Sequence, residues 1–320
     1  MGPAKTLDGD ALRANAAAFA ALGAPVAAVL KRDGYGWGAA HMARELEGSV
    51  ESFVVADADE FEALRPATSR PIRLLAEVAP DRLPGILDAG GIPNVATPAG
   101  LAAAAAQGRR RGGATIRVGI LDAALWSAVR PQDAAAFAQA AAGSGLRVEL
   151  WTHIAAPSRA EEILGGLAAA QRAFAAAGVP VAGTDVAGTA AAAPATARER
   201  LRIGAGLFGV RLGAPVRLRC AIRVDAPVVR RFAAGTVAWA GYGERRVPPG
   251  SEAAVLRCGY GDGWPSTAAG RGAILAVGMQ YTTVACGDGD PGALVGPATD
   301  LDALAAECGV EPHAFVVGLA

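Results

Sequence analysis

From Leu7 to about Gly213 the chain alternates short β-type runs with alanine-rich helical stretches. This alternation is typical of repeated β-α units around a parallel sheet. The strand candidates of this region are Val26–Leu30, Ser52–Val55, Ile72–Ala76, Asn94–Ala96, Ile116–Ile120, Val148–Thr152, Val181–Asp185 and Arg202–Ala205. Eight such runs predict an α/β fold, a (β/α)8 barrel of the TIM type.

The composition changes after Val210, where short β-type runs are separated by Gly, Pro and Asp turns. No long helical stretch follows until Asp300–Cys308. This pattern indicates a separate, mainly β domain. Because a glycine and a proline interrupt the chain at Leu212-Gly213-Ala214-Pro215, we predict a barrel domain over residues 1–213 and a mainly β domain over residues 214–320.

The composition and charge of the chain limit the kinds of molecule that it is expected to bind. With 320 residues, 52% of them hydrophobic, the chain can bury a large core. Its 30 basic and 30 acidic residues balance, so neither nucleic acid nor an anionic membrane is favoured, and a small-molecule ligand fits better. Four scattered cysteines without a Cys-x-x-Cys pair argue against a zinc site, and we expect a cytoplasmic protein without a signal peptide.

One lysine lies at the end of a buried strand candidate. Lys31 follows the apolar run Val26–Leu30, and a Gly-Tyr-Gly turn centred on Tyr35 comes directly after it. A buried strand that ends in an ammonium group must satisfy or neutralise that charge. A lysine desolvated enough to lose its proton is the nucleophile that forms a Schiff base with a carbonyl cofactor. The sequence therefore predicts pyridoxal 5'-phosphate bound at Lys31.

A second glycine-rich motif lies about 230 residues downstream, over Arg257–Pro265. Glycines on both sides of Tyr260 allow a sharp turn that directs the phenol into a cleft. The same residues also suit an ordinary glycine-rich turn with a packed tyrosine. The motif alone leaves both interpretations open.

Both motifs resemble segments of the alanine racemase family. Residues 28–38 resemble its cofactor-lysine signature, Ala-Val-Val-Lys-Ala-Asn-Ala-Tyr-Gly-His-Gly, with Asp33 and Trp37 in place of the asparagine and the histidine. Residues 259–265 resemble Gly-Tyr-Ala-Asp-Gly-Tyr/Trp-Pro, which carries the second catalytic base of that family. The resemblance implies that Lys31 and Tyr260 are two bases and that Tyr35 binds the cofactor phosphate.

The resemblance extends to other cofactor-binding segments. Residues 202–209 are similar to Arg-x-Gly-x-x-x-Tyr-Gly, which implies that Arg202 bonds the pyridine nitrogen and that Gly204 and Ala205 hold phosphate. Thr189 falls at the phosphate-binding serine of the family segment Ala-Asn-Ser-Ala-Ala. The stretch at residues 151–155 resembles Met-Thr-His-Phe-Ala, which implies that His153 packs at the cofactor ring.

The substrate side of the site resembles the family less closely. Met279 lies in a loop similar to Cys-Met-Asp-Gln, in which the methionine amide meets the substrate carboxylate. The family segment Lys-x-Asp-Thr-Gly-Met-x-Arg-Leu-Gly should fall within Val118–Val129, but that stretch has neither the lysine nor the arginine, and Trp126 replaces the latter. One lost charge-assisted contact is worth roughly 1.5–3 kcal/mol, so we expect weaker binding of a free amino acid.

The resemblance implies a pyridoxal-phosphate-dependent racemase of a small amino acid, in which Lys31 and Tyr260 exchange the Cα proton on opposite faces. It also implies a head-to-tail homodimer in which Tyr260 serves the Lys31 of the other subunit. Two alternatives stay open: an enzyme of the same fold with a drifted substrate or reaction, and a non-catalytic homologue that only binds the cofactor.

Overall fold

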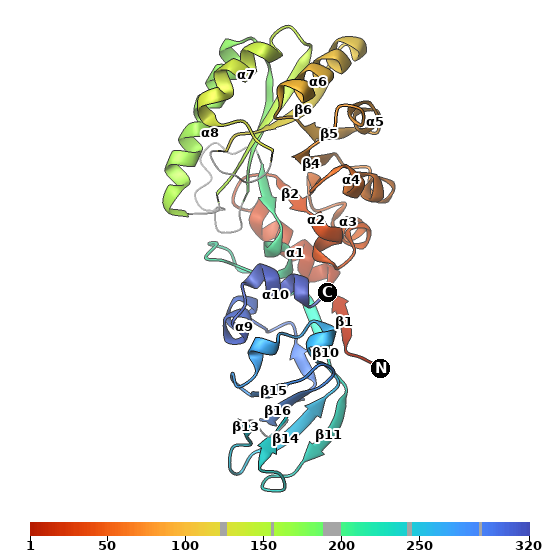
Figure 1. Ribbon diagram of the computed structural model, residues 1–320, viewed down its shortest axis with the longest axis vertical. Helices are drawn as coiled ribbons and strands as arrows, with labels where there is room; N and C mark the ends of the chain where they lie inside the picture. The colour runs from red at the N-terminus through yellow and green to blue at the C-terminus, as the bar shows by residue number, and fades with distance from the viewer. Residues whose placement is uncertain (122–126, 155–156, 188–199, 242–244, 288–289) are drawn as a thin grey trace. The chain divides into compact units, whose positions relative to one another are not determined.

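The computed structural model describes the chain except residues 122–126, 155–156, 188–199, 242–244 and 288–289 (Figure 1). The described residues form two compact units. A barrel unit comprises Ala16–Gly204 and Leu212–Val216, and a β-rich unit comprises Met1–Asn15, Ala205–Arg211 and Arg217–Ala320. Among the helices that can be described, none has the length and apolarity needed to cross a membrane.

The barrel unit contains a closed barrel of parallel strands, which confirms the predicted fold class. In order around the barrel the strands are β2 (Val26–Val29), β3 (Ser52–Val55), β4 (Ile72–Glu77), β5 (Gly91–Asn94), β6 (Ala114–Gly119), β7 (Leu146–His153), β8 (Val181–Ala187) and β9 (Leu201–Ile203). Every strand candidate of the sequence overlaps or adjoins one of these strands. β2 and β3 are buried throughout because they are covered on both faces.

Helices surround the barrel strands (Figure 1). In chain order the helices up to the end of the barrel are α1 (Gly9–Ala20), α2 (Lys31–Tyr35), α3 (Ala39–Leu46), α4 (Ala58–Leu64), α5 (Leu83–Asp88), α6 (Pro98–Arg111), α7 (Ala134–Ala141) and α8 (Ala160–Ala176). Local signals fix several ends. Asp57 caps α4 by accepting hydrogen bonds from the Asp59 and Glu60 amides, and Gly112 ends α6 in a left-handed conformation.

The ladder between β5 and β6 is the weakest around the barrel. These strands pair only at Asn94 and Arg117. Pro93 in β5 has no N–H to donate, which limits the ladder. β5 also begins three residues before the predicted run. Gly91 and Pro93 have low strand propensity, so the sequence pattern does not indicate a strand there.

In its described residues, the β-rich unit contains three small antiparallel sheets, the start of α1 and two C-terminal helices. Their strands are β1 (Ala4–Leu7), β10 (Ile222–Asp225) and β17 (Ala293–Val295); β11 (Val228–Phe232), β14 (Glu252–Leu256), β16 (Thr282–Cys286) and β15 (Ile274–Val277); and β12 (Trp239–Ala240) with β13 (Arg245–Arg246). The helices are α9 (Leu301–Cys308) and α10 (Pro312–Gly318). Because β1 pairs with β10, the first residues belong to this unit, whereas the sequence analysis assigned residues 1–213 to the barrel.

Candidate active site

Lys31 lies two residues beyond the end of β2, a strand whose Ala27 and Val29 side chains face the barrel interior. Ala27 and Val29 of this strand belong to an interior cluster, and side chains of a strand alternate with a period of two residues. The chain then makes a left-handed turn, with φ values of 55° at Arg32, 51° at Asp33 and 62° at Tyr35. L-residues rarely adopt this conformation, and such strain is concentrated at functional sites.

Two carboxylates hold this left-handed turn. Glu60 accepts hydrogen bonds from the Arg32 amide at 2.6 Å and from the Ala56 amide at 2.8 Å. Asp33 accepts a hydrogen bond from the Ala39 amide at 2.7 Å. These bonds offset part of the backbone strain and so fix the position of the lysine that precedes the turn.

The surroundings of Lys31 favour its neutral form. Burial lowers the pKa of Lys31, the nearby Arg202 guanidinium lowers it further, and the Glu60 carboxylate opposes this change in part. A larger fraction of the amine is therefore unprotonated near neutral pH than for an exposed lysine. An unprotonated amine is the form that attacks a carbonyl carbon.

Tyr35 is packed directly against the end of β9. A Cβ atom added at Gly204 would lie 2.0 Å from the Tyr35 Oη atom, so only glycine permits this approach. Burial raises the pKa of Tyr35 well above its usual value, and the phenol keeps its proton as a hydrogen-bond donor. The two residues form a buried cradle, in which a hydroxyl donor lies against a backbone segment that has no side chain, and such a donor suits an anionic group.

Arg202 lies inside the barrel rather than on its surface. Its Nη1 atom donates to Asp185 at 2.8 Å, and its Nη2 atom donates to the Thr152 carbonyl oxygen at 2.7 Å. The guanidinium also lies over the Trp151 ring, 4.6 Å from the ring centroid. The hydrogen bonds at the edge of the guanidinium and the aromatic ring at its face thus fix the orientation of Arg202.

Sequence reasoning missed a network of buried ion pairs around Arg202. Arg117 donates from Nη2 to both carboxylate oxygens of Asp185, at 2.9 and 2.6 Å. A second group joins Arg73 and Arg200 to Glu149. A signal was present, because Arg73 and Arg117 interrupt apolar strand candidates, and a charge inside a buried strand needs a partner.

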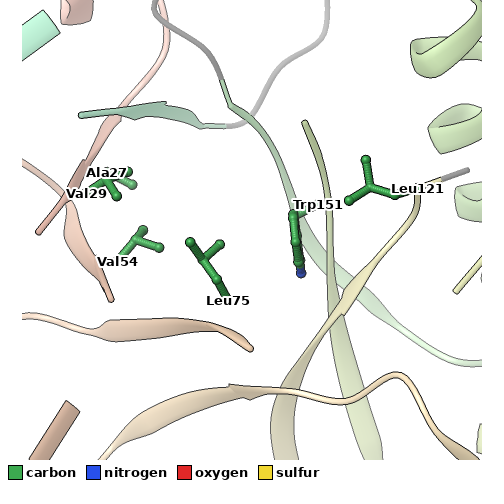
Figure 2. Close-up of a cluster of buried hydrophobic side chains, with 6 residues drawn as sticks. All are labelled: Ala27, Val29, Val54, Leu75, Leu121 and Trp151. Carbon is green, nitrogen blue, oxygen red and sulfur yellow. The ribbon is translucent and has the colours of Figure 1, made fainter. Parts of the chain in front are cut away.

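An apolar cluster lies toward the carboxyl ends of the barrel strands. Figure 2 shows its side chains, which come from β2, β3, β4 and β7 and from the residue after Ile120. Its members are Ala27, Val29, Val54, Leu75, Leu121 and Trp151. The large Trp151 ring stands where the family segment quoted above has methionine, and its Nε1 atom donates to Asn94 Oδ1 at 2.9 Å.

Of the other predicted barrel residues, the structure describes His153 and Ala205 but not Thr189 or Trp126. His153 ends β7 and is partly exposed, one residue beyond the buried Thr152. Ala205 is buried and follows Gly204 directly, at the start of a short 3-10 helix (Ala205–Phe208). Thr189 and Trp126 lie outside the described residues.

In the β-rich unit, backbone hydrogen bonds bring Tyr260 and Met279 together. The Tyr260 amide donates to the Gly278 carbonyl oxygen at 3.0 Å, and the Gly261 amide donates to the Met279 carbonyl oxygen at 2.9 Å. A Cβ atom at Gly259 would lie 2.3 Å from the Gly278 carbonyl oxygen, so this turn needs glycine. The side chains of Tyr260 and Met279 are 48% and 60% exposed.

Comparison with known proteins now decides the family. The family model for the N-terminal domain of alanine racemase matches residues 7–212, which is more than half of the chain. The chain belongs to the alanine racemase family. A curated alanine racemase from Halorhodospira halophila is 51% identical over 67 residues, a match that spans 20% of this chain and 18% of that relative.

Solved alanine racemases share the fold of this family member over its whole length. The enzyme from Acinetobacter baumannii has a TM-score of 0.85 at 17% identity, and the one from Streptomyces lavendulae has 0.82 at 22% identity. They cover 100% of this chain, which in turn covers 98% and 95% of theirs. The alanine racemase from Bartonella henselae with covalently bound pyridoxal phosphate has a TM-score of 0.81 at 19% identity, with coverage of 100% and 98%.

Proposed function

We propose that this alanine racemase family member is a pyridoxal-phosphate-dependent racemase of an amino acid, with Lys31 and Tyr260 as its two bases. The observation that carries the proposal is the position of Lys31, partly buried at the end of a barrel strand beside Arg202. The chain has only two lysines, Lys5 and Lys31, among its 30 basic residues. Because arginine cannot bind an aldehyde covalently, a lysine retained at this position supports a chemical role.

The residues of the barrel fit the cofactor. Lys31 would bind its aldehyde carbon, and the cradle of Tyr35 and Gly204 would hold its phosphate together with the residues that follow, Ala205 among them. Arg202 would face the ring nitrogen, with His153 at the ring; the phosphate role of Thr189 stays a prediction. When bound, pyridoxal phosphate makes the Cα–H bond of an amino acid acidic by delocalising the resulting charge.

Each base would move one proton at Cα. Lys31 Nζ would take or return the proton on one face of the bound amino acid, and the Tyr260 phenol oxygen would do so on the opposite face. Inversion follows when one base removes the proton and the other returns one. Arg202 keeps its own proton and would leave the ring nitrogen uncharged, which suits a simple proton exchange.

We also propose a head-to-tail homodimer in which Tyr260 of the partner subunit completes the site. Tyr260 and Met279 are exposed beside Tyr281, which is 45% exposed, so this face of the β-rich unit presents three large side chains to solvent. Exposed groups of this kind mark interaction surfaces. Met279 would offer its backbone amide to the substrate carboxylate.

A drifted substrate is the second candidate. The apolar cluster includes Trp151 and Leu121, and the stretch Val118–Val129 has neither the lysine nor the arginine of the family segment. Loss of that guanidinium beside an apolar cluster favours a larger or derivatised amino acid over free alanine. Both candidates use the same two bases.

The test is chiral analysis of a panel of L-amino acids with a free α-amine, including ones derivatised at the carboxylate or the side chain, incubated with the protein and pyridoxal phosphate. The proposal expects formation of the D-enantiomer from at least one of them, and its loss in Lys31→Ala. Tyr281→Phe, on the same exposed face, serves as the control for Tyr260→Phe. Undiminished turnover by Lys31→Ala would refute the assignment, and cofactor binding without α-proton exchange would favour a non-catalytic role.

A further inference from the structure

Asp185 in β8 is the buried carboxylate that joins the two arginines of the barrel interior. Its side chain is fully buried and accepts hydrogen bonds from Arg117 and from Arg202. Arg200 Nη1 lies 3.6 Å from its Oδ2 atom. Burial by itself would raise the pKa of Asp185, but these guanidiniums together hold it below its usual value. Asp185 is therefore ionised.

Trp151 gives both guanidiniums a common platform. The Cζ atoms of Arg117 and Arg202 lie 5.4 and 4.6 Å from the centroid of its ring. The ring is itself held by its hydrogen bond to Asn94, whose Nδ2 atom donates to the Ser127 carbonyl oxygen at 2.7 Å. A fixed ring and a shared carboxylate leave Arg202 little freedom to rotate.

The charges around Lys31 depend on this arrangement. Arg202, which pairs with Ala27 four residues before Lys31, lowers the pKa of Lys31, and Glu60 raises it. Asp185 touches Arg202 directly and carries the opposite charge, so it reduces the positive field that Arg202 exerts on the amine. Arg117 has the opposite effect on the pKa of Lys31, because its positive charge is balanced by the same carboxylate and so leaves less of that negative charge to offset Arg202.

We propose that Asp185 is a positioning residue, which holds Arg202 in the orientation it needs toward the cofactor ring and balances its charge at Lys31. The part concerning the ring depends on the proposed function. The part concerning Lys31 depends on the charge of Arg202, whose strand β9 pairs with β2, the strand that precedes Lys31.

The test uses carbon-13 methylation of the amines of the cofactor-free protein and follows each resonance with pH. Lys31 is one of only two lysines, so Lys5 is an internal reference. In Asp185→Asn the titration midpoint of Lys31 falls by on the order of one pH unit, as expected when Arg202 loses the carboxylate that balances its charge, at an effective dielectric constant of about 20. Arg117→Gln removes a positive charge instead and raises the midpoint, so it tests the sign even where Asp185→Asn fails to fold.

The matched control is Glu149→Gln. Glu149 is also a buried carboxylate, and it accepts from Arg73 at 2.6 and 2.9 Å. It shares Arg200 with Asp185, whereas Arg202 and Arg117 donate to Asp185. A merely structural role predicts that Asp185→Asn and Glu149→Gln both lower the melting temperature and that neither moves the Lys31 midpoint. That result would overturn the proposal.

A second readout tests the orientation of Arg202. The absorbance of added pyridoxal phosphate is followed between about pH 6 and pH 10, a range that runs from the usual pKa of histidine to that of lysine. A changed spectrum in Asp185→Asn, restored in part by Asp185→Glu and unchanged in Glu149→Gln, supports the positioning role. If the wild-type protein binds no cofactor, the proposed function fails while the Lys31 titration still decides the role of Asp185.

Discussion

The barrel unit and the β-rich unit hold their proposed bases in opposite ways. Lys31 is partly buried, follows a strained turn and feels the charge of Arg202. Tyr260 lies on a turn fixed by backbone hydrogen bonds and leaves half of its side chain in solvent. The barrel therefore surrounds Lys31 with burial and charge that lower its pKa, whereas the β-rich unit holds Tyr260 at its surface through the backbone.

This difference explains where each base would acquire its chemistry. A buried lysine beside a guanidinium is adjusted within its own unit. An exposed phenol gains a comparable environment only when another surface covers it. The contrast supports the proposed dimer, and substitutions in either unit test it.

The largest effect is expected from Lys31→Arg. Arginine keeps the positive charge at the strand end but cannot bind an aldehyde, so racemisation and covalent capture of pyridoxal phosphate should both be lost. Borohydride reduction followed by peptide mapping measures the capture. Lys5→Arg is the control, because Lys5 donates to the Asp262 carbonyl oxygen in the β-rich unit, and it should retain capture at Lys31. Capture at Lys5 instead would contradict the prediction.

Tyr260→Phe should slow racemisation in both directions, because inversion uses both bases, but it should slow α-proton exchange from only one enantiomer. Removing one of two bases is expected to slow α-proton exchange from one enantiomer by about 10²–10⁴-fold and to leave exchange from the other enantiomer largely intact. Deuterium incorporation from D2O into each enantiomer measures this asymmetry. Equal slowing of both enantiomers would show that Tyr260 is not a face-specific base, and Tyr281→Phe should slow neither.

Much of the barrel was predictable because apolar β-type runs and helix signals repeat along the chain. Lys31 was predictable for the same reason, since it ends such a run. The left-handed turn was not, because Arg32 and Asp33 are ordinary residues whose backbone is forced by Glu60 and by tertiary packing. The partners of a buried charge are equally hidden, since Arg117 and Asp185 are 68 residues apart and meet only through the barrel register.

A smaller effect is expected from Gly204→Ala. The added methyl group would meet the Tyr35 hydroxyl at 2.0 Å and force one of the two residues to move. We expect the unfolding free energy to fall by about 1–3 kcal/mol and the affinity for pyridoxal phosphate to weaken. Denaturant unfolding and cofactor titration measure the two effects. Gly85→Ala, where a Cβ atom meets nothing within 4 Å, should show neither, and Tyr35→Phe in the same chain should relieve part of the clash.

The smallest effect is expected from Glu60→Gln, which changes the barrel side of the comparison without touching the cofactor cradle. Glutamine can accept from the Arg32 amide or from the Ala56 amide with its one carbonyl oxygen, but it lacks the second acceptor, so stability should fall by about 1 kcal/mol.

The same substitution removes the carboxylate that raises the pKa of Lys31, and the Lys31 midpoint should therefore move to lower pH. Since the neutral amine prevails above that midpoint, capture of pyridoxal phosphate should reach its plateau at lower pH than in the wild-type protein. Glu62→Gln on the same helix removes an exposed partner of Arg82 and should leave this profile unchanged. A shift of the capture profile to higher pH in Glu60→Gln would show that the left-handed turn, rather than the charge of Glu60, governs the reactivity of Lys31.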